Sequence, residues 1–324
     1  MIPKRAVFLQ SIFFASLGIL FLYLSFRKTN FTNLWQVFQM GNYWVVLPVF
    51  LVSITVYISR VKRWKLLYKA SQIDAPQSYL LASLASGYLV NFAVPRLGEI
   101  SRALILKRSL NYPVNISLST IVFERLADVL CLAIILFVAF FLEFIYAGSL
   151  LNQFTNGINV FSWQKLGAIL VLLLGLYLGY KRLKTKHNQI SNWITELVDN
   201  LIKLLRMPNF GWFIFHTAII WLGFFLMTYL WFFMFTESAK LSIYQAYLVM
   251  VLGVVARTLP IQAGSAGAYH YIVSKALVLL GVSVSIGNAL AIVIHGFQTI
   301  LTLLFGLLAY IWLLKKRTSN RQDV

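Results

Sequence analysis

The chain has 324 residues, of which 60% are hydrophobic and 11% are charged, and its formal net charge is +19. This composition excludes a soluble globular protein and indicates an integral membrane protein, because apolar segments fill nearly the whole length. Most Lys and Arg residues lie in short loops, where they fix topology and contact anionic lipid headgroups, so nucleic-acid binding is not expected.

Six apolar segments are predicted to cross the membrane as helices. They are residues 8–26, 43–59, 117–142, 164–180, 212–235 and 287–314. The first has a basic start, as a signal peptide does, but no small-residue cleavage site follows, so we expect it to be a retained span. Lys and Arg accumulate in the loops of one side, which by the positive-inside rule places both termini in the cytoplasm.

Two segments outside the spans are predicted to be helical as well. Residues 61–70 extend the second span with a basic stretch, in which Trp64 and Tyr68 suit the membrane interface. Residues 188–206 place apolar side chains at helical spacing and are expected to form an amphipathic cytoplasmic helix lying on the membrane.

Two further apolar segments, residues 79–108 and 244–281, break in the middle and are predicted to be re-entrant helical hairpins. The arm from Tyr79 to Pro95 is about 25 Å of helix, and the arm after it is too short and too charged to span alone. Two full spans in place of each hairpin would give the same sidedness, so the positive-inside rule does not distinguish the two models. The length of the arms and the charges after Pro95 favour hairpins. Broken helices at membrane depth line cavities, and transporters bind substrate there.

The order span, span, hairpin, span occurs twice and predicts an inverted repeat. Tyr43 and Trp212, like Pro95 and Pro260, lie about half a chain length apart. Each half has three crossings, so the second half is inverted and the two hairpins open to opposite sides. The predicted division is residues 1–145 for the first repeat, 146–211 for the next span with the linker helix, 212–314 for the rest of the second repeat, and 315–324 for a cytoplasmic tail.

Polar residues at the first break are expected to bind an anion. Arg96, Glu99 and Arg102 follow Pro95 at a spacing of three, so both arginines can pair with the carboxylate, and Asn91 precedes the break. The N-terminus of the second arm adds partial positive charge, which suits a phosphate. The alternative is that the arginines extend to the interface from a short cytoplasmic helix.

A second charged group begins the third span. Arg125 and Asp128 are predicted to form a polar network with the charges that follow Pro95, because intramembrane charges are costly and are usually paired. Glu124 lies beside them. The alternative for Glu124 and Arg125 is a position at the cytoplasmic interface, since about 20 residues back from Leu142 reach only to their neighbourhood.

The second break combines a cation with small residues. Arg257 precedes Pro260, and residues 264–267 are small enough to expose backbone N–H groups at a helix start. A substrate-lining role is predicted, against the alternative of a tight turn for helix packing. His270 adds polarity, and with His295 it would form a proton relay, although membrane histidines more often hydrogen-bond to neighbouring helices.

No metal or nucleotide cofactor is expected. The sequence contains no HExxH or CxxC motif and no P-loop lysine motif. The single cysteine, Cys131, excludes a disulfide within the chain.

The stretch N-F-A-V-P-R-L-G-E-I-S-R (residues 91–102), followed by E-R-L-A-D (124–128), resembles the lysylphosphatidylglycerol synthase transmembrane-region family, the flippase-like domain of multiple peptide resistance proteins. Residues 259–267 resemble the second signature of that family. The resemblance covers essentially the whole chain. It implies functional roles for Pro95, Arg96, Gly98, Glu99, Arg102, Arg125, Asp128, Pro260, Gly264 and Gly267.

The chain departs from the family pattern at three points. The family more often has a residue between the proline and the arginine, which are adjacent here as Pro95 and Arg96. An acidic residue often follows the second signature, where this chain has Tyr269 and His270. The soluble aminoacyl-transferring domain of bifunctional members has no counterpart, so synthase activity is not expected.

The resemblance implies a bacterial inner-membrane lipid translocase for anionic or aminoacylated phospholipids or another lipid-linked substrate, rather than an enzyme. Two alternatives stay open. One is a membrane-embedded transferase with Glu99 or Asp128 as base, and the other is a non-catalytic partner of a lipid synthase. The expected partners are membrane lipids, with a lipid-modifying enzyme and a second copy of the chain left open.

Overall fold

The computed structural model describes residues 20, 23, 31–94, 96–145, 199, 202, 206–258 and 262–322. This part of the chain is helical throughout, which confirms the predicted all-α class. Its helices are α2 (Phe31–Gln39), η1 (Tyr43–Val45), α3 (Val46–Ala70), α4 (Gln77–Ala93), α5 (Leu97–Leu110), α6 (Val114–Ile145), α10 (Phe210–Phe232), η2 (Ser238–Lys240), α11 (Ile243–Thr258), α12 (Gln262–Leu279) and α13 (Val284–Gln322).

Four of the six predicted spans are found among the described residues. Helices long and apolar enough to cross a membrane cover Tyr43–Ala70, Val114–Leu142, Phe210–Phe232 and Val284–Lys316. Large apolar side chains on their outer faces stay exposed, as lipid contact requires; Phe137 on α6 is 68% exposed. The chain is therefore a polytopic membrane protein. The predicted span 164–180 lies outside the described residues, as do the predicted span 8–26 apart from residues 20 and 23 and nearly all of the linker helix 188–206.

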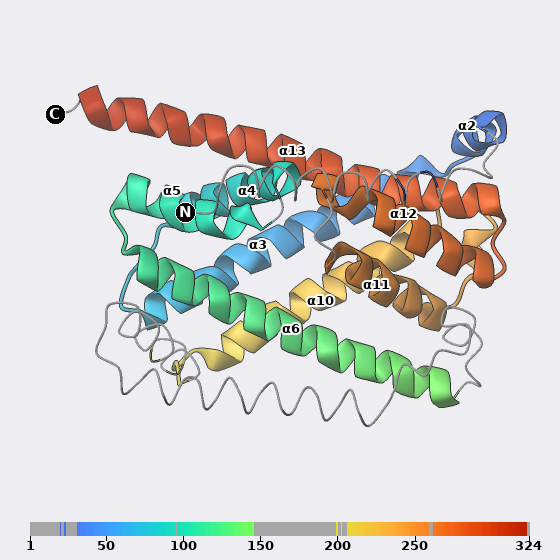
Figure 1. Ribbon diagram of the computed structural model, residues 1–324, viewed down its shortest axis with the longest axis horizontal. Helices are drawn as coiled ribbons and strands as arrows, with labels where there is room; N and C mark the ends of the chain where they lie inside the picture. The colour runs from blue at the N-terminus through green and yellow to red at the C-terminus, as the bar shows by residue number, and fades with distance from the viewer. Residues whose placement is uncertain are drawn as a thin grey trace.

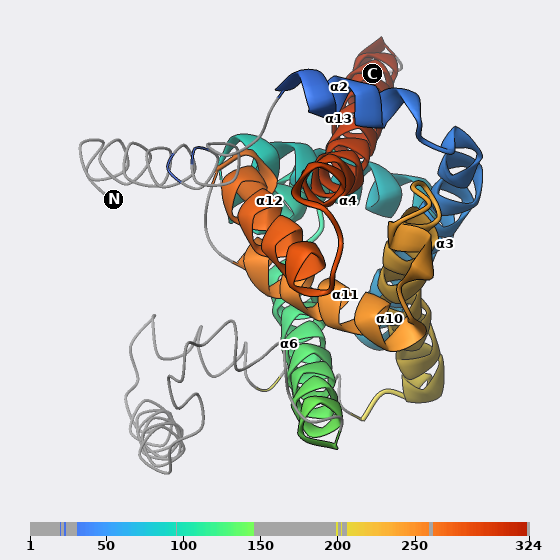
Figure 2. The same ribbon diagram turned by 90° about the vertical axis from the view of Figure 1, so that its right-hand side faces the viewer.

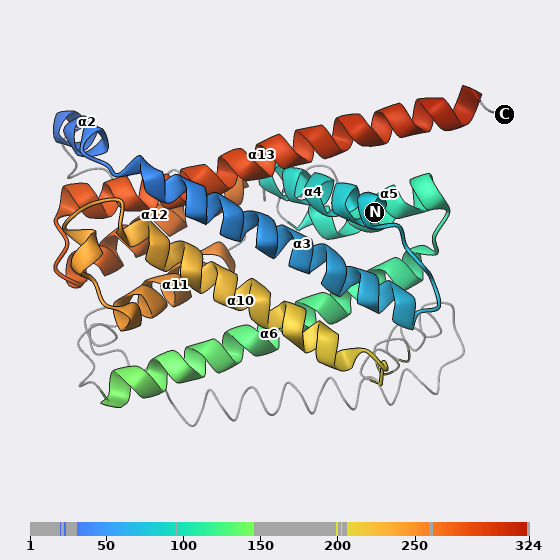
Figure 3. The same cartoon turned by 180° about the vertical axis from the view of Figure 1, so that it is seen from behind.

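Both predicted hairpins are present as helix pairs. In the first hairpin α4 packs against α5, and in the second α11 packs against α12. The first hairpin connects α3 to α6 and the second connects α10 to α13. Figures 1 and 3 show that they open toward opposite ends of the molecule, with their tips near the middle. Pro95 and Pro260 themselves lie outside the described residues, and the repeat boundaries stay a prediction.

The spanning helices hold the two hairpins together. Helix α3 packs along α10, and α13 crosses both α4 and α12. Figure 2, seen from the end where the second hairpin opens, shows α3 beside α10 and α6 at the lower edge. Gly306 of α13 lies against Leu89 of α4, and Gly223 of α10 lies against Val56 of α3, so small residues bring the helix backbones close.

The tip of the first hairpin is fixed by Asn91. Its side-chain oxygen accepts a hydrogen bond from the Gly98 backbone N–H at 2.6 Å, which satisfies a donor that the start of α5 would otherwise leave free. Its amide nitrogen donates to the Glu99 carboxylate at 3.3 Å. Val94 is extended, as expected before a proline, and Arg96 has a left-handed backbone with φ of 66°. Helix α4 therefore ends at Ala93, and α5 begins at Leu97 in the reversed direction.

The arms of this hairpin leave no room for a side chain at Gly98. A methyl group there would overlap the Gly87 carbonyl oxygen and the Asn91 side chain. We expect Gly98→Ala to lower the free energy of unfolding by about 1–3 kcal/mol, because overpacking forces the arms apart. Unfolding of the purified protein in detergent measures the change.

Gly296→Ala on α13 is the matched control, because a methyl group there meets no atom within 4 Å. It should leave stability unchanged or slightly higher, as replacing a helical glycine with alanine does. Equal stability of the two variants would contradict the close packing of the first hairpin.

Candidate functional site

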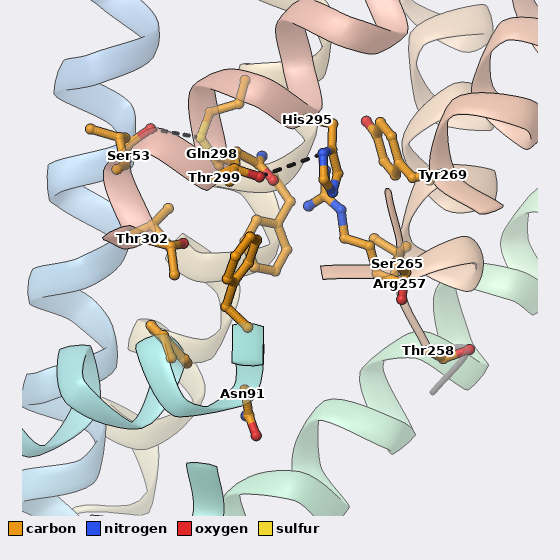
Figure 4. A pocket seen from close by; sticks show the side chains of 18 of the residues that line it. Ser53, Asn91, Arg257, Thr258, Ser265, Tyr269, His295, Gln298, Thr299 and Thr302 are labelled. Atoms are coloured by element: carbon orange, nitrogen blue, oxygen red, sulfur yellow. Dashed lines mark hydrogen bonds between the residues drawn. The ribbon is translucent and has the colours of Figure 1, made fainter. Parts of the chain in front are cut away.

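A central cavity of about 500 Å³ lies where the two hairpin tips meet. Both hairpins and all four spanning helices contribute to its wall, which Figure 4 shows from close by. Its charged and polar lining residues are Ser53, Tyr57, Arg60, Tyr88, Asn91, Arg96, Glu99, Arg125, Thr228, Arg257, Thr258, Ser265, Tyr269, His295, Gln298, Thr299 and Thr302.

The central cavity carries an excess of positive charge. Four arginines line it: Arg60 from α3, Arg96 from the first break, Arg125 from α6 and Arg257 from α11. Glu99 is the one carboxylate among the described lining residues. Charges interact strongly in a site walled by protein and lipid, so the cavity favours an anion.

A buried ion-pair cluster adjoins the cavity, and Glu124 is at its centre. The Glu124 carboxylate is fully buried and lies 2.9 Å from Arg102, 3.2 Å from Arg63 and 2.6 Å from Arg125. Asp128 completes the cluster at 2.8 Å from Arg63 and 3.1 Å from Arg125. These contacts join α3, α5 and α6, so the cluster fixes the first hairpin against two spans.

The ion-pair cluster also positions the cavity arginines. Arg125 reaches both the cluster and the cavity, and Arg60 lies 3.9 Å from Glu124 at the same boundary. Arg60 further donates to the Tyr88 hydroxyl at 2.9 Å and lies 5.4 Å from the Phe224 ring centre. Their carboxylate partners therefore hold these two guanidinium groups in the cavity wall.

The predicted network around Arg125 and Asp128 is present, but its partners differ from those expected at the first break. Arg102 turns away from Glu99, stacks on the Trp64 ring at 4.0 Å and pairs with Glu124. Glu99 instead accepts the hydrogen bond from Asn91 described above. Arg96 lines the cavity and has no ion pair with a described residue. Arg102 and Asp128 thus belong to the cluster, and Arg96 and Glu99 to the cavity.

The sequence suggested that Trp64 and Tyr68 contact the membrane interface, but both side chains are fully buried inside the protein. Trp64 donates to the Thr120 hydroxyl at 3.0 Å, and Tyr68 donates to the Ser117 hydroxyl at 2.7 Å. Polar partners on α6 satisfy both rings, which removes the need for water. The Glu124 side chain is likewise buried inside the protein, with 0% of its surface exposed, so it does not face the lipid headgroups.

Arg60 and Arg63 were missed by sequence reasoning. They stand in the basic run that ends the second span, where a positive charge normally indicates a cytoplasmic boundary. A signal was nevertheless present: Arg60, Arg63, Trp64 and Leu67 recur at helical spacing and mark one face of α3. That face is buried against α6 and α10, and Arg63 has no exposed surface.

The second hairpin brings Arg257 into an aromatic setting. Its guanidinium lies 4.4 Å from the Tyr269 ring centre, and the buried Tyr269 ring lies 5.4 Å from that of His295. His270 is buried and does not line the cavity, and its ring centre lies 5.0 Å from that of His295. Figure 4 shows Arg257, Tyr269 and His295 converging at one end of the cavity.

The other predicted residues of this hairpin are placed as follows. Gly264 lies in the first turn of α12, and Gly267 is buried one turn further along the helix. Pro260 lies outside the described residues. Ser265, between the two glycines, lines the cavity and has a left-handed backbone with φ of 63°.

An apolar groove of about 710 Å³ runs between α6, α10 and α11. Its lining residues are Ile135, Val138, Leu142, Trp221, Leu222, Phe225, Ile243, Tyr244, Tyr247 and Met250. Met250 lines both this groove and the central cavity, so the two spaces meet at its side chain. The Tyr247 hydroxyl donates to the Ile135 carbonyl at 2.6 Å and holds α11 against α6.

The described residues contain no group of three or more His, Cys, Asp or Glu side chains that could hold a metal ion. The site offered by this part of the chain therefore consists of guanidinium groups, neutral polar side chains and one carboxylate.

Residues 7–306 match the family model of the lysylphosphatidylglycerol synthase TM region. The match covers nearly the whole chain, so the protein belongs to this family of membrane proteins, which is associated with lipid handling. No curated protein and no solved structure matches the sequence.

The ion-pair cluster should depend on Glu124 for its stability. We expect Glu124→Gln to lower the free energy of unfolding by about 3–5 kcal/mol, because Arg63 and Arg102 then stay buried without their shared carboxylate. Asp74→Asn, which removes an ion pair from an exposed carboxylate, should change it by less than about 1 kcal/mol. Unfolding in detergent measures both changes. A mild effect of Glu124→Gln would show that the ion-pair cluster does not stabilise the fold.

Proposed function

We propose that this member of the family is a translocase for lipids with an anionic headgroup, which enters the central cavity between the two hairpin tips. The observation that carries the proposal is the arginine excess at the point where two broken helix pairs meet. Intramembrane charges that face a cavity are costly to maintain and are typical of a substrate path. Transporters built from inverted repeats bind cargo at such breaks.

Arg96 and Arg257 are the residues best suited to hold the phosphate. Neither has a carboxylate partner among the described residues, whereas Arg60 and Arg125 share Glu124. A guanidinium group binds phosphate through two parallel hydrogen bonds, which gives both affinity and orientation. The N-terminus of α5 lies beside Arg96 and adds partial positive charge.

Glu99 gives the cavity a place for a cationic part of the cargo. Its carboxylate is the single negative group among the described lining residues, and Asn91 is its one hydrogen-bond partner there. An amine on a headgroup could therefore bind Glu99 while its phosphate binds the arginines. This arrangement supports an aminoacylated or other amine-bearing lipid as one form of the cargo.

The apolar groove supports a lipid over a soluble anion. A lipid whose headgroup occupies the cavity must keep its acyl chains in apolar surroundings, and the groove adjoins the cavity at Met250, which lines both spaces. Its stretch from Ile135 to Leu142 on α6 is about 10 Å long, against about 15 Å for half of the hydrocarbon core. Such a groove accommodates much of one acyl chain.

The placement of the arginines suggests how transport proceeds. Arg96 belongs to the first hairpin and Arg257 to the second, so one phosphate bound by both links the two hairpins. Because the hairpins open toward opposite ends, rocking of one against the other would expose the headgroup to each side in turn. The proposed setting is a bacterial inner membrane with both termini in the cytoplasm.

Neutralising either cargo arginine should impair transport. In proteoliposomes that report the leaflet of a fluorescent phosphatidylglycerol by quenching, we expect Arg96→Gln and Arg257→Gln each to slow translocation at least about ten-fold. That is the effect of losing one charge-assisted hydrogen bond. Lys62→Gln, an exposed charge on α3 outside the cavity, is the control and should transport normally.

Two further measurements distinguish the translocase from the alternatives: lipid analysis of the same vesicles, and identification of proteins that co-purify with the chain. Normal translocation by both arginine variants would reject the arginines as the headgroup site, and absence of translocation by the wild type would reject the translocase. A covalently altered lipid that depends on Glu99 would indicate the transferase instead. Co-purification with a lipid synthase, together with tolerance of the arginine substitutions, would indicate the non-catalytic partner.

The apolar groove should be needed for translocation but not for folding. We expect Val138→Trp to slow translocation, because the indole fills the groove beside the path of the acyl chain. Leu136→Trp places the same indole on the lipid-facing side of α6, outside the groove, and should transport normally. Equal rates in the same vesicle assay would show that the acyl chain takes another path.

A further inference from the structure

The positive charge around the central cavity exceeds what one phosphate neutralises. Among the described residues, six arginines line the cavity or belong to the adjoining ion-pair cluster, against three carboxylates, which leaves an excess of three positive charges. The arginines are Arg60, Arg63, Arg96, Arg102, Arg125 and Arg257, and the carboxylates are Glu99, Glu124 and Asp128. A lipid with one phosphodiester carries a single negative charge and would leave most of this excess unpaired, which is costly at membrane depth.

This excess is divided between two parts of the cavity wall. At the hairpin breaks, Arg96 and Arg257 line the cavity together with Glu99, the one carboxylate among the described lining residues. At the boundary with the ion-pair cluster, Arg60 and Arg125 share two carboxylates with two further arginines. Both parts therefore keep positive charge that no described carboxylate balances.

The two cluster arginines that reach the cavity are accessible to a ligand. The Arg125 side chain is 39% exposed and that of Arg60 is 13% exposed, and both line the cavity. Arg63 and Arg102, which do not line it, are 0% and 3% exposed. A guanidinium group has five N–H donors, so Arg60 and Arg125 can bind a phosphate while they stay paired with Glu124.

The two groups of arginines are close enough for one headgroup to contact both. Arg60 donates to the Tyr88 hydroxyl at 2.9 Å, and Tyr88 lies on the same face of α4 as Asn91, three residues further along, where the first break begins. Three residues of helix correspond to about 4.5 Å. Arg96 follows directly at that break, and all four residues line the cavity. Two phosphates that share a bridging oxygen can therefore occupy the space between Arg60 and Arg96.

We propose that the central cavity is built for a lipid diphosphate, with one phosphate at Arg96 and Arg257 and the other at Arg60 and Arg125. This inference rests on the proposed translocase function and adds the class of headgroup to it. A terminal diphosphate carries about two to three negative charges at neutral pH, so it neutralises nearly all of the excess. A lipid with one phosphate binds in the same cavity and is held less tightly.

Two lipids with the same acyl chains isolate the contribution of the second phosphate. Diacylglycerol diphosphate carries it, whereas phosphatidylmethanol has one phosphate capped by a methyl group. Binding of each lipid to the purified full chain is measured by native mass spectrometry, with a chelator present so that no divalent cation neutralises the diphosphate. We expect the wild type to bind the diphosphate at least about ten-fold more tightly, the size of one additional charge-assisted hydrogen bond.

Arg60→Gln should lower this preference, because it removes a guanidinium group from the site of the second phosphate. Lys62→Gln removes an equal charge from the same helix, on an exposed side chain outside the cavity, and is the matched control that should preserve the preference. Arg60→Lys keeps the charge and should retain more of the preference than Arg60→Gln. Equal binding of the two lipids by the wild type would overturn the inference, and so would an unchanged preference in Arg60→Gln.

Inorganic diphosphate tests whether the occupant is a lipid. It offers the same anionic group without acyl chains, so it gains nothing from the apolar groove. We expect it to displace diacylglycerol diphosphate only at a concentration at least about ten-fold higher than that of the lipid. Displacement at equal concentration would assign the site to a soluble diphosphate and overturn the inference of a lipid.

Arg96→Gln and Arg257→Gln separate this inference from the proposed function. If they weaken both lipids while the wild type fails to distinguish them, the anion site stands and the diphosphate inference falls. If neither variant weakens either lipid, the arginines at the breaks do not hold the headgroup, and both proposals for the cavity fall. A wild type that prefers the diphosphate but moves no lipid in the vesicle assay would keep the diphosphate site and reject the translocase.

Discussion

The buried carboxylate of Glu124 is the interaction on which the first half of this protein depends. Three arginines from three helices approach it within ion-pair distance of 3.2 Å or less, and it has no exposed surface. A charge at this depth persists only when it is paired, and the arginines likewise need it. The first hairpin can therefore insert a charged arm, α5, beside α3 and α6 because those spans supply its counter-charges.

The same cluster explains why the cavity stays positive. Two carboxylates, Glu124 and Asp128, serve Arg63, Arg102 and Arg125, and Arg60 lies just beyond them. Both carboxylates are paired with arginines that hold the helices together, so the arginines that reach the cavity are incompletely neutralised. The paired cluster and the positive charge of the cavity thus come from one uneven distribution of charge.

The fold was largely predictable from the sequence, and the site was predictable in part. Apolar length and the central prolines revealed the spans and hairpins, because these are properties of contiguous residues. The partner of Arg102 was not predictable from local spacing. Arg102 pairs with Glu124 on α6, which is distant in sequence, and not with Glu99 on its own helix. The role of Arg63 was not predictable either. A basic run at the end of a span has the same local pattern whether its side chains face water or a buried acid.

The elements of the cavity wall differ in the charge of the side chains that they contribute. The arginines come from the breaks and from helices fixed by the cluster, and their strong, long-range attraction acts on any anion. Gln298, Thr299 and Thr302 of α13 are uncharged, interact only at hydrogen-bond distance, and stand on the helix that packs against both hairpins. A ligand that filled the cavity would contact the breaks and α13 together, so its binding would link the two hairpins to the helix that packs against both of them.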